Sequence, residues 1–365
     1  MAAILLVGPQ RHSLGGVTSH LDLLFASSLA REYQLTHFAV GAEGSRETRL
    51  RKLARVARAP LRFAAALRRS NAALVHLNPS MDQSFWRELP LLLAARLMGR
   101  RVVLQIHGGL LPEQFCAGAP GASWLVRAAL RAADRLVLLA RAEQSAYDRF
   151  VGRPMLALIP NAIDPAPYAG AKPDPYDGTR PLRAVYLGRI VRSKGLFDAC
   201  DAVAAALRAG ARIEFLIAGD GPDRAALAGH VAALGLEPSI RLVGALQGAA
   251  KARFLLEGDV FLFPTRHPEG LPYALLEAMA AATPPLTTPA GAIPDVVTDG
   301  RDGLLLGEGD IDACAAALAG LAGDPGRVHA LARAARERVS RDYSLARLER
   351  DFHALYRELL AARQP

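Results

Sequence analysis

Short apolar runs alternate with helical segments along the whole chain, and this alternation constrains the fold more than any other feature. In the first half, the apolar runs are rich in Val, Ile and Leu, and the segments between them carry apolar residues at helical spacing. Strands and helices that alternate in this way form parallel sheets covered by helices. We therefore expect strands at residues 3–7, 34–40, 73–77, 102–106, 135–139 and 156–159.

A stretch rich in Pro, Gly and Asp interrupts the alternation at residues 160–181. This composition cannot continue a strand or a helix and is typical of a linker. The alternation then restarts, with strands expected at residues 183–188, 213–218, 240–243, 260–263 and 285–288. The sequence thus predicts an α/β fold of two doubly wound, Rossmann-like domains that face a cleft. These domains are residues 1–165 and 182–342, with a linker at 166–181 and a closing helix at 343–365.

The composition excludes several classes of protein. The chain has 365 residues, enough for two domains, and 51% of them are hydrophobic without a low-complexity tract. No apolar run approaches the roughly 20 residues of a membrane-spanning helix. The start MAAILLV lacks the basic residues of a signal peptide, so we interpret it as the first strand. Three scattered cysteines suit a reducing compartment, and we expect a cytoplasmic protein.

The net charge of +9 is concentrated in the first half of the chain. Residues 1–165 hold 21 Lys and Arg against 11 Asp and Glu, whereas residues 166–365 hold 23 against 24. Most of the excess falls in Arg46–Arg69, where Pro60 is expected to divide the segment into two helices. One helical face would carry Arg51, Arg55, Arg58, Arg62 and Arg69. This face is either solvated or binds an anionic membrane or lipid phosphate. Nucleic acid fits less well, because the stretch has one aromatic residue and no binding module around it.

Two carboxylates, Glu269 and Glu277, lie eight positions apart across a Gly-Leu-Pro turn. The strand before them ends at Pro264 and the segment after them favours helix. Glu269 should therefore lie on a loop at the carboxyl end of a strand, where ligands bind in open α/β sheets. The two acids could form an acid–base pair like that of a glycosidase, or each could bind a different part of one polar ligand.

Two glycine loops each lie between a strand and a helix. Gly8–Gly16 contains Gly15 and Gly16, which let a backbone come close to a ligand, and the following helix offers free N–H groups to an anion. Gly188–Gly195 carries Arg189 and Lys194, two cations that suit phosphate oxygens. A plain structural turn and a solvated basic loop are the respective alternatives.

Weaker signals come from other strand ends. Gly219 and Gly244 each close a strand, and Asp223 is a candidate helix cap. His107 begins the loop His107-Gly-Gly109 after an apolar strand, while partial burial explains His20 equally well. No cluster of residues offers a credible metal site: the Asp-x-Asp sequence opens a late helix, where capping explains it.

Taken together, these motifs resemble those of the retaining glycosyltransferases of family 4, which have the GT-B fold. The resemblance spans nearly the whole chain and rests on the order of Gly15–His20, His107-Gly108, Pro160–Asp164, Gly188-Arg189, Lys194-Gly195 and Glu269-x7-Glu277. The tail Tyr343–Tyr356 is similar to the family's closing helix, which crosses back onto the first domain. Ala162 and Ala282 stand where the family usually has Gly, and Ala290-Gly291 stands where two glycines are usual.

The resemblance implies a role for each residue. Arg189 and Lys194 would hold the donor's diphosphate, and Glu277 would accept hydrogen bonds from the ribose hydroxyls. Glu269, with the backbone amides of Gly270 and Leu271, would face the transferred sugar and its phosphate. The implied catalytic set is Glu269, His107, Arg189 and Lys194. The implied donor-binding set is Gly15, Gly16, Arg189, Lys194, Gly219, Gly244, Glu269, Gly270, Leu271 and Glu277. Such enzymes are generally independent of metal, so no cofactor is expected beside the nucleotide-sugar substrate.

The implied reaction is the retaining transfer of a hexosyl group from a UDP- or GDP-sugar to a cell-surface glycan or lipid-linked acceptor. The second domain would bind the donor, and the basic first domain would face the acceptor, peripheral at the inner face of the cytoplasmic membrane. Two alternatives stay open. One is a nucleotide-sugar epimerase or hydrolase of the same fold, and the other is a non-catalytic relative that binds nucleotide-sugar.

Overall fold

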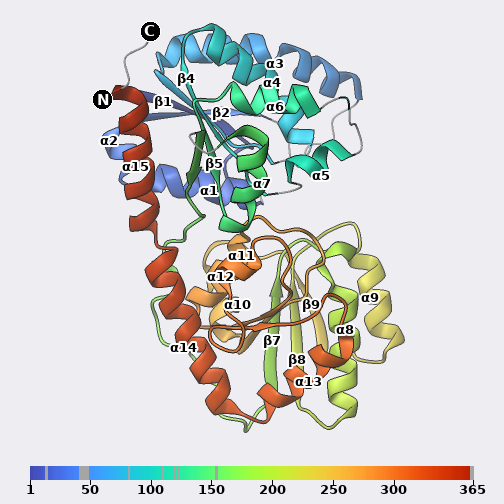
Figure 1. The fold of residues 1–365 in the computed structure, drawn as a ribbon. Helices are drawn as coiled ribbons and strands as arrows, with labels where there is room; N and C mark the ends of the chain where they lie inside the picture. The colour runs from blue at the N-terminus through green and yellow to red at the C-terminus, as the bar shows by residue number, and fades with distance from the viewer. Residues whose placement is uncertain are drawn as a thin grey trace. The chain divides into compact units, whose positions relative to one another are not determined.

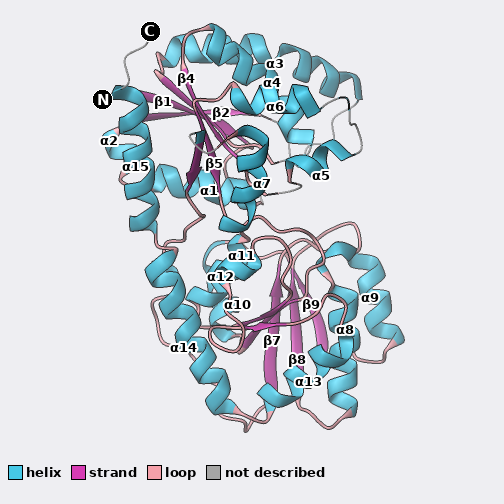
Figure 2. Cartoon of the chain, viewed as in Figure 1, coloured by secondary structure: helices cyan, strands magenta, loops and turns pink. Residues whose placement is uncertain are grey.

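The computed structural model describes residues 1–12, 15–40, 49–80, 83–108, 111–117, 121, 123–152 and 155–361, and of residues 49–54 it describes the backbone alone. The chain divides into two units, Met1–Ala162 with Leu345–Pro365, and Ile163–Ser344 (Figure 1). Within the described residues, each unit contains a six-stranded parallel sheet between helices (Figure 2). The prediction of two doubly wound, Rossmann-like α/β domains is confirmed.

The sheet of the first unit has the strand order β2-β1-β3-β4-β5-β6. Its strands are β1 (Ala3–Gly8), β2 (Gln34–Ala39), β3 (Leu74–Leu77), β4 (Arg101–Gln105), β5 (Arg135–Leu138) and β6 (Leu156–Leu158). Each predicted strand of this half is present, with ends shifted by at most one residue. The order reverses between β1 and β3, which is the kind of switch point where open α/β sheets bind ligands.

Helices cover both faces of this sheet. One face carries α1 (Gly16–Ala26), α2 (Leu29–Glu32) and α15 (Leu345–Ala361). The other carries α3 (Arg49–Ser70), α4 (Gln83–Leu97), α5 (Pro112–Ala117), α6 (Ser123–Arg131) and α7 (Arg141–Val151). Along β1, Ile4 and Leu6 belong to the first core, and Leu5 and Val7 belong to the second. The apolar runs in the sequence are therefore strands buried on both faces.

The prediction that Pro60 divides the basic segment into two helices is wrong. The helix α3 continues through Pro60 from Arg49 to Ser70. An interior proline costs a helix about 3 kcal/mol or more. Phe63 and Leu67, which follow it, are both 0% exposed, so we attribute the continuity to burial of the second half of the helix. Arg46 and the side chain of Arg51 lie outside the described residues.

The closing helix α15 packs on the first unit through polar contacts as well as apolar ones. The Tyr356 hydroxyl lies 2.7 Å from Nδ1 of His76 on β3, and the Tyr33 hydroxyl lies 2.9 Å from Nδ1 of His353. The backbone N–H of Ser28 donates to the Glu349 carboxylate at 2.6 Å. The end of the chain is thus part of the first unit's fold.

The sheet of the second unit has the order β12-β11-β10-β7-β8-β9. Its strands are β7 (Leu182–Leu187), β8 (Ile213–Ala218), β9 (Ile240–Gly244), β10 (Val260–Phe263), β11 (Pro285–Thr287) and β12 (Leu304–Leu305). The sequence pattern missed β12, since two residues are too short to show a period. Val260 of β10 pairs with Ala184 of β7, and the order reverses between these two strands.

Helices also cover both faces of the second sheet. On one face, α8 (Leu196–Arg208) contacts both α9 (Arg224–Ala233) and α13 (Ile311–Ala322). The helices α10 (Gly248–Glu257), α11 (Tyr273–Ala280) and α14 (Pro325–Asp342) cover the other, close to the short helix α12 (Ile293–Val296) and the 3₁₀ turn η3 (Ala166–Tyr168). The Asp310 carboxylate caps α13 by accepting from the Ala313 N–H at 2.9 Å, as the sequence predicts.

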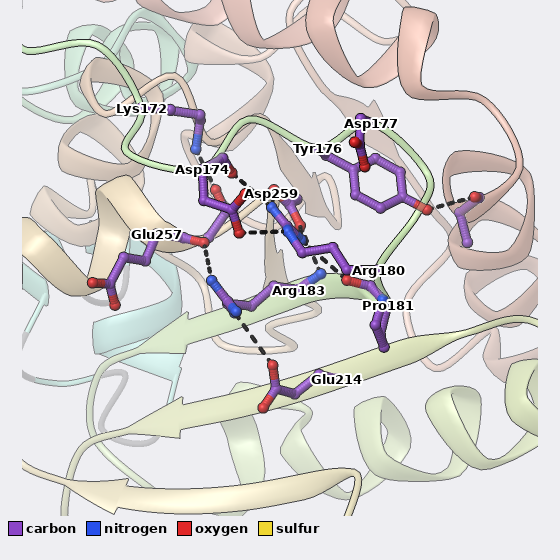
Figure 3. A network of polar contacts seen from close by, with 12 residues as sticks. Lys172, Asp174, Tyr176, Asp177, Arg180, Pro181, Arg183, Glu214, Glu257 and Asp259 are labelled. Atoms are coloured by element: carbon purple, nitrogen blue, oxygen red, sulfur yellow. Dashed lines mark hydrogen bonds and ion pairs between the residues drawn. The ribbon is translucent and has the colours of Figure 1, made fainter.

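The segment before β7 is fastened to the amino ends of β7 and β10 by an ion-pair network (Figure 3). The Arg180 guanidinium bonds both oxygens of Asp259, at 2.6 and 3.0 Å. The Asp259 side chain is only 1% exposed and also accepts from the Arg183 N–H at 2.8 Å. Lys172 donates to the Gly258 carbonyl and, at 3.0 Å, to Thr283, and burial lowers its pKa to about 8. The predicted linker residues 172–181 are therefore held against the second unit.

We predict that Asp259→Ala lowers the free energy of unfolding by about 3–5 kcal/mol, because it removes the buried partner of Arg180 and the acceptor of the Arg183 N–H. Urea denaturation followed by circular dichroism measures this change. Asp174→Ala is the matched control, since Asp174 pairs with the same Arg180 but its side chain is 57% exposed. That variant should cost less than about 1 kcal/mol. Equal costs would contradict a buried anchor at Asp259.

Candidate functional site

Two loops meet at the switch point of the second unit, where β7 and β10 end. The Lys194 ammonium from the loop after β7 pairs with Oε1 of Glu269 from the loop after β10. The same oxygen accepts from the Thr265 hydroxyl at 2.9 Å. The Lys194 and Glu269 side chains are 17% and 10% exposed. The residue predicted to bind the diphosphate and the residue predicted to face the sugar thus lie in direct contact.

Glycine permits this close approach. Gly195 has φ of 71°, and a Cβ on it would overlap the Pro264 carbonyl oxygen. Beside this contact, the Arg266 N–H donates to the Ser193 carbonyl at 2.8 Å. A larger residue at 195 would push the loop that carries Lys194 away from the loop that carries Glu269.

Gly219 and Gly244 align the neighbouring loops. A Cβ on Gly219 would overlap the Gly188 carbonyl oxygen, and the Gly219 N–H donates to the Gly244 carbonyl at 2.8 Å. Asp223 is not the side-chain cap that the sequence suggests. Its carboxylate instead accepts from the Arg192 N–H at 2.8 Å and so ties the loop after β8 to the loop after β7.

The two cations of the loop after β7 differ in their engagement. Arg189 is exposed, its carbonyl accepts from the Tyr186 hydroxyl at 2.8 Å, and its guanidinium makes no ion pair with any residue that the structure describes. Lys194 is engaged by Glu269 and lies 5.7 Å from the centre of the Phe263 ring. The site therefore offers one unoccupied cation and one that is already neutralised.

Glu277 lies in the second turn of α11 and is 8% exposed. Its Oε1 accepts from the Lys251 ammonium of α10 at 2.6 Å. Burial raises the pKa of Glu277, and the Lys251 charge opposes that rise. Lys251 was missed by sequence reasoning, because a lone helical lysine has no motif around it. The rarity of lysine was the available signal, since the chain has only four lysines.

Residues 290–292 support the Glu269 loop from the side of β11. Gly291 has φ of 60°, and a Cβ on it would overlap the Glu269 carbonyl oxygen, to which the Ala292 N–H donates at 2.8 Å. Gly270 and Leu271 lead from Glu269 into α11, whose start has no side-chain cap. Ala282, after the end of α11, has φ of 53°, a conformation that glycine adopts more easily.

The first unit holds the remaining predicted residues. Gly15, with φ of 150°, precedes α1, Gly16 begins it, and no side chain caps this end of the helix. His107 follows β4, and Gly109, the last residue of its His107-Gly-Gly109 motif, lies outside the described residues. A Cβ on Gly15 would meet only the Thr18 hydroxyl oxygen, in ordinary contact at 3.9 Å, so the backbone dihedral is what favours glycine there.

Asn78 fixes the protonation of the His107 ring. The Asn78 amide nitrogen donates to the carbonyls of Val7 and His76 at 3.0 and 3.2 Å. Its Oδ1 therefore faces Nε2 of His107 at 3.0 Å. Burial, with smaller effects of His20 and His76, lowers the pKa of His107 well below its ordinary value. The ring is thus neutral with its proton on Nε2, which leaves Nδ1 as a hydrogen-bond acceptor.

Two buried histidines lie behind His107. The ring of His20 is 4.7 Å from that of His107, and His20 is fully buried, beyond the partial burial that the sequence suggested. His76 bonds Tyr356 at 2.7 Å and Gln105 at 3.0 Å. Burial lowers the pKa of both His20 and His76 to about 3, so both rings are neutral. They serve as packing for His107 rather than as charges.

The described residues hold neither a cluster of metal ligands nor a helix that could span a membrane. In that part of the chain, no three His, Cys, Asp or Glu side chains gather as a metal site requires. No helix there combines the length and apolar character needed to span a bilayer.

Comparison with known proteins identifies the class. Solved structures with the same fold include sucrose-phosphate synthase from Thermosynechococcus elongatus, with a TM-score of 0.81 and 19% identity over 100% of both chains. HepE from Anabaena, solved in complex with UDP, has a TM-score of 0.74 and 16% identity over 98% of this chain and 100% of its own. The two parallel sheets and these neighbours define a protein of the GT-B glycosyltransferase fold.

Residues 181–324 match the model of the family described as glycosyl transferases group 1. Alpha-maltose-1-phosphate synthase from Mycolicibacterium smegmatis is 30% identical over 341 residues, which are 81% of this chain and 86% of that protein. The chain belongs to the group 1 glycosyl transferases. The amylovoran biosynthesis glycosyltransferase AmsK from Erwinia amylovora is 32% identical over 185 residues. That alignment covers 49% of this chain and 44% of AmsK, so the chain matches less than half of that relative.

We predict that Gly291→Ala lowers glycosyl transfer by about 100-fold, because displacement of the Glu269 backbone by an ångström misplaces a site residue. Steady-state kinetics with the donor that the wild type uses would measure this. Gly300→Ala is the matched control: Gly300 also has positive φ, at 71°, but a Cβ there would meet nothing within 4 Å. The control should lose about 1–2 kcal/mol of stability and keep its activity. Full activity of Gly291→Ala would remove this support from the site.

Proposed function

We propose that this chain transfers a hexosyl group from a nucleotide diphosphate sugar, a UDP- or GDP-sugar, to a glycan or lipid-linked acceptor, with retention and without a resident metal. The observation that carries the proposal is the Lys194–Glu269 pair at the switch point of the second unit, beside Arg189. A diphosphate needs cations at a strand end, and a sugar needs a carboxylate close to them.

The cations would stabilise the diphosphate as it leaves. Arg189 makes no ion pair with a described residue and is open to a phosphate oxygen. Lys194 would shift from Glu269 toward the diphosphate when the donor binds, and Glu269 would then accept from a sugar hydroxyl. Charges aimed at the leaving group stabilise the transition state more than the ground state, which is the basis of their catalytic effect.

Glu277 would bind the ribose of the donor. Its Oε1 is engaged by Lys251, and Oε2 makes no hydrogen bond with any described residue, so one oxygen is available to the ribose hydroxyls. The structural neighbour HepE has been solved with UDP and with UDP-glucose, which supports a uridine nucleotide as the first one to test.

The first unit would supply the uncapped start of α1 at Gly16 to the donor phosphate and His107 to the reacting sugar. With its proton on Nε2, His107 would accept a hydrogen bond through Nδ1 from a sugar hydroxyl. AmsK is described as a glycosyltransferase of amylovoran biosynthesis, and a second relative, WcaL from Salmonella typhimurium, as one of colanic acid biosynthesis. These descriptions support a cell-surface glycan as the acceptor.

The function is tested by thermal shift with UDP, GDP and ADP and with their sugars. One nucleotide should stabilise the protein strongly. With the nucleotide-sugar that carries this nucleotide as donor, Lys194→Met should lower the rate of transfer by about 100-fold or more. Arg192→Met is the matched control, because Arg192 is a cation of the same 3₁₀ turn, stacked on Phe197 at 4.3 Å. The proposal fails if no nucleotide stabilises the protein, and release of free sugar without an acceptor would indicate a hydrolase instead.

The basic helix α3 is proposed to attach the protein to an anionic membrane from the cytoplasmic side. Arg58, Arg62 and Arg69 are exposed on α3, and Leu61 among them is 75% exposed, as suits a helix that lies on a bilayer. Each arginine near an anionic surface contributes about 1 kcal/mol. Changing all three to Gln should thus weaken binding to phosphatidylglycerol vesicles on the order of 100-fold.

Co-sedimentation with these vesicles measures the effect. The control changes three exposed arginines of α14, Arg327, Arg333 and Arg341, to Gln, which removes the same charge from another helix. Equal losses of vesicle binding in the two variants would mean that the net charge of the protein, and not the position of the arginines on α3, determines binding. No loss in the α3 variant would leave that helix as a solvated surface.

A further inference from the structure

The Lys251–Glu277 ion pair joins α10 and α11, the helices that follow β9 and β10 along the chain of the second unit. Lys251 lies in the first turn of α10, after β9, and Glu277 lies in α11, after β10. The ammonium is 2.6 Å from Oε1, and the two side chains are 25% and 11% exposed. The ion pair is therefore partly shielded from water, unlike the exposed pair Arg253–Glu257 on the same helix, where the Arg253 side chain is 81% exposed.

The pair engages the carboxylate on one side only. A lysine donates as a point charge and leaves the second oxygen open, whereas an arginine fork would take both. Oε2 of Glu277 makes no hydrogen bond within the described residues. Glu269 has the same form, since Lys194 and Thr265 both bond its Oε1.

We propose that Lys251 is a positioning residue of the nucleotide site: it holds Glu277 as an ionised carboxylate through Oε1, so that Oε2 accepts hydrogen bonds from the ribose hydroxyls. This inference rests on the proposed function, in which Glu277 binds ribose. Lys251 acts through Glu277, and its effect on nucleotide binding depends on that carboxylate.

The surroundings of Glu277 make this cation necessary. Tyr168 of η3 and Tyr273 of α11 face the carboxylate, and burial followed by the Glu277 charge raises the pKa of each. Arg336 of α14 donates to the carbonyls of Ala280 and Tyr168 instead. Among the described residues, Lys251 is thus the cation that opposes the effect of burial on Glu277. A protonated Glu277 would lose acceptor capacity toward the ribose.

Calorimetric titration with UDP, GDP and ADP at pH 7.5 tests the inference on the full chain. For the nucleotide that the wild type binds, Lys251→Met should weaken binding at least about tenfold, because it removes one partner of a shielded charge pair. Lys251→Arg should also weaken binding, because an arginine fork would occupy Oε2 as well as Oε1. Arg253→Met, on the same helix, should bind like the wild type. Wild-type affinity in Lys251→Met would overturn the inference.

A double-mutant cycle separates action through Glu277 from direct contact with the nucleotide. In the Glu277→Gln background, Lys251→Met should change nucleotide affinity no further. A further tenfold loss there would mean that Lys251 binds the nucleotide by itself, and the inference would be wrong. The double variant also carries no unpaired buried charge at this position, so it should fold even where Lys251→Met does not.

The pH dependence of binding gives a readout that a structural role would not move. Because Lys251 opposes the rise in the pKa of Glu277, binding by Lys251→Met should decline at a higher pH than binding by the wild type as the solution is acidified. An unchanged acid limb contradicts the inference. If the wild type binds none of the three nucleotides, the proposed function fails; if it binds one and Lys251→Met binds equally well, this inference alone fails.

Discussion

The backbone contact between the loops after β7 and β10 is the constraint on which the candidate site depends. Parallel strands end at one edge of a sheet, but that alone brings loops only near each other. Glycine at position 195 removes the side chain that would overlap the Pro264 carbonyl, and glycine at 291 does the same opposite Glu269. Lys194 and Glu269, 75 positions apart in sequence, can then pair at low exposure.

Low exposure to water strengthens the electrostatic interactions between the charged side chains of the site. Coulomb interactions strengthen as water is excluded, so Lys194–Glu269 and Lys251–Glu277 hold their side chains in place before any ligand arrives. Each lysine bonds one carboxylate oxygen and leaves the other without a partner among the described residues. With Arg189, the site has three cations and two carboxylates, and this excess of positive charge favours an anionic ligand. Binding would exchange one ion pair for another and so limit the cost of reorganisation.

The strands and the principal acids could be predicted because their signals are local. Strands buried on both faces are continuous apolar runs, and loops at strand ends carry glycines beside charged residues. What could not be predicted depends on tertiary contacts. The burial of Phe63 and Leu67 carries α3 through Pro60, and the approach of two loops turns Asp223 from a cap into a partner of Arg192. Lys251 gains its meaning only from the packing of α10 on α11.

In the second unit, the residues that stabilise the fold are different from the residues that would bind the ligand. The buried pair Arg180–Asp259 and the Lys172 contacts lie at the amino ends of β7 and β10, while Lys194 and Glu269 follow the carboxyl ends of the same strands. Both strands are thus fixed at one edge by groups that play no part at the other. The loops at the carboxyl edge can then carry left-handed glycines, exposed cations and carboxylates with one oxygen unpaired, because the register of the strands beneath them is secured elsewhere.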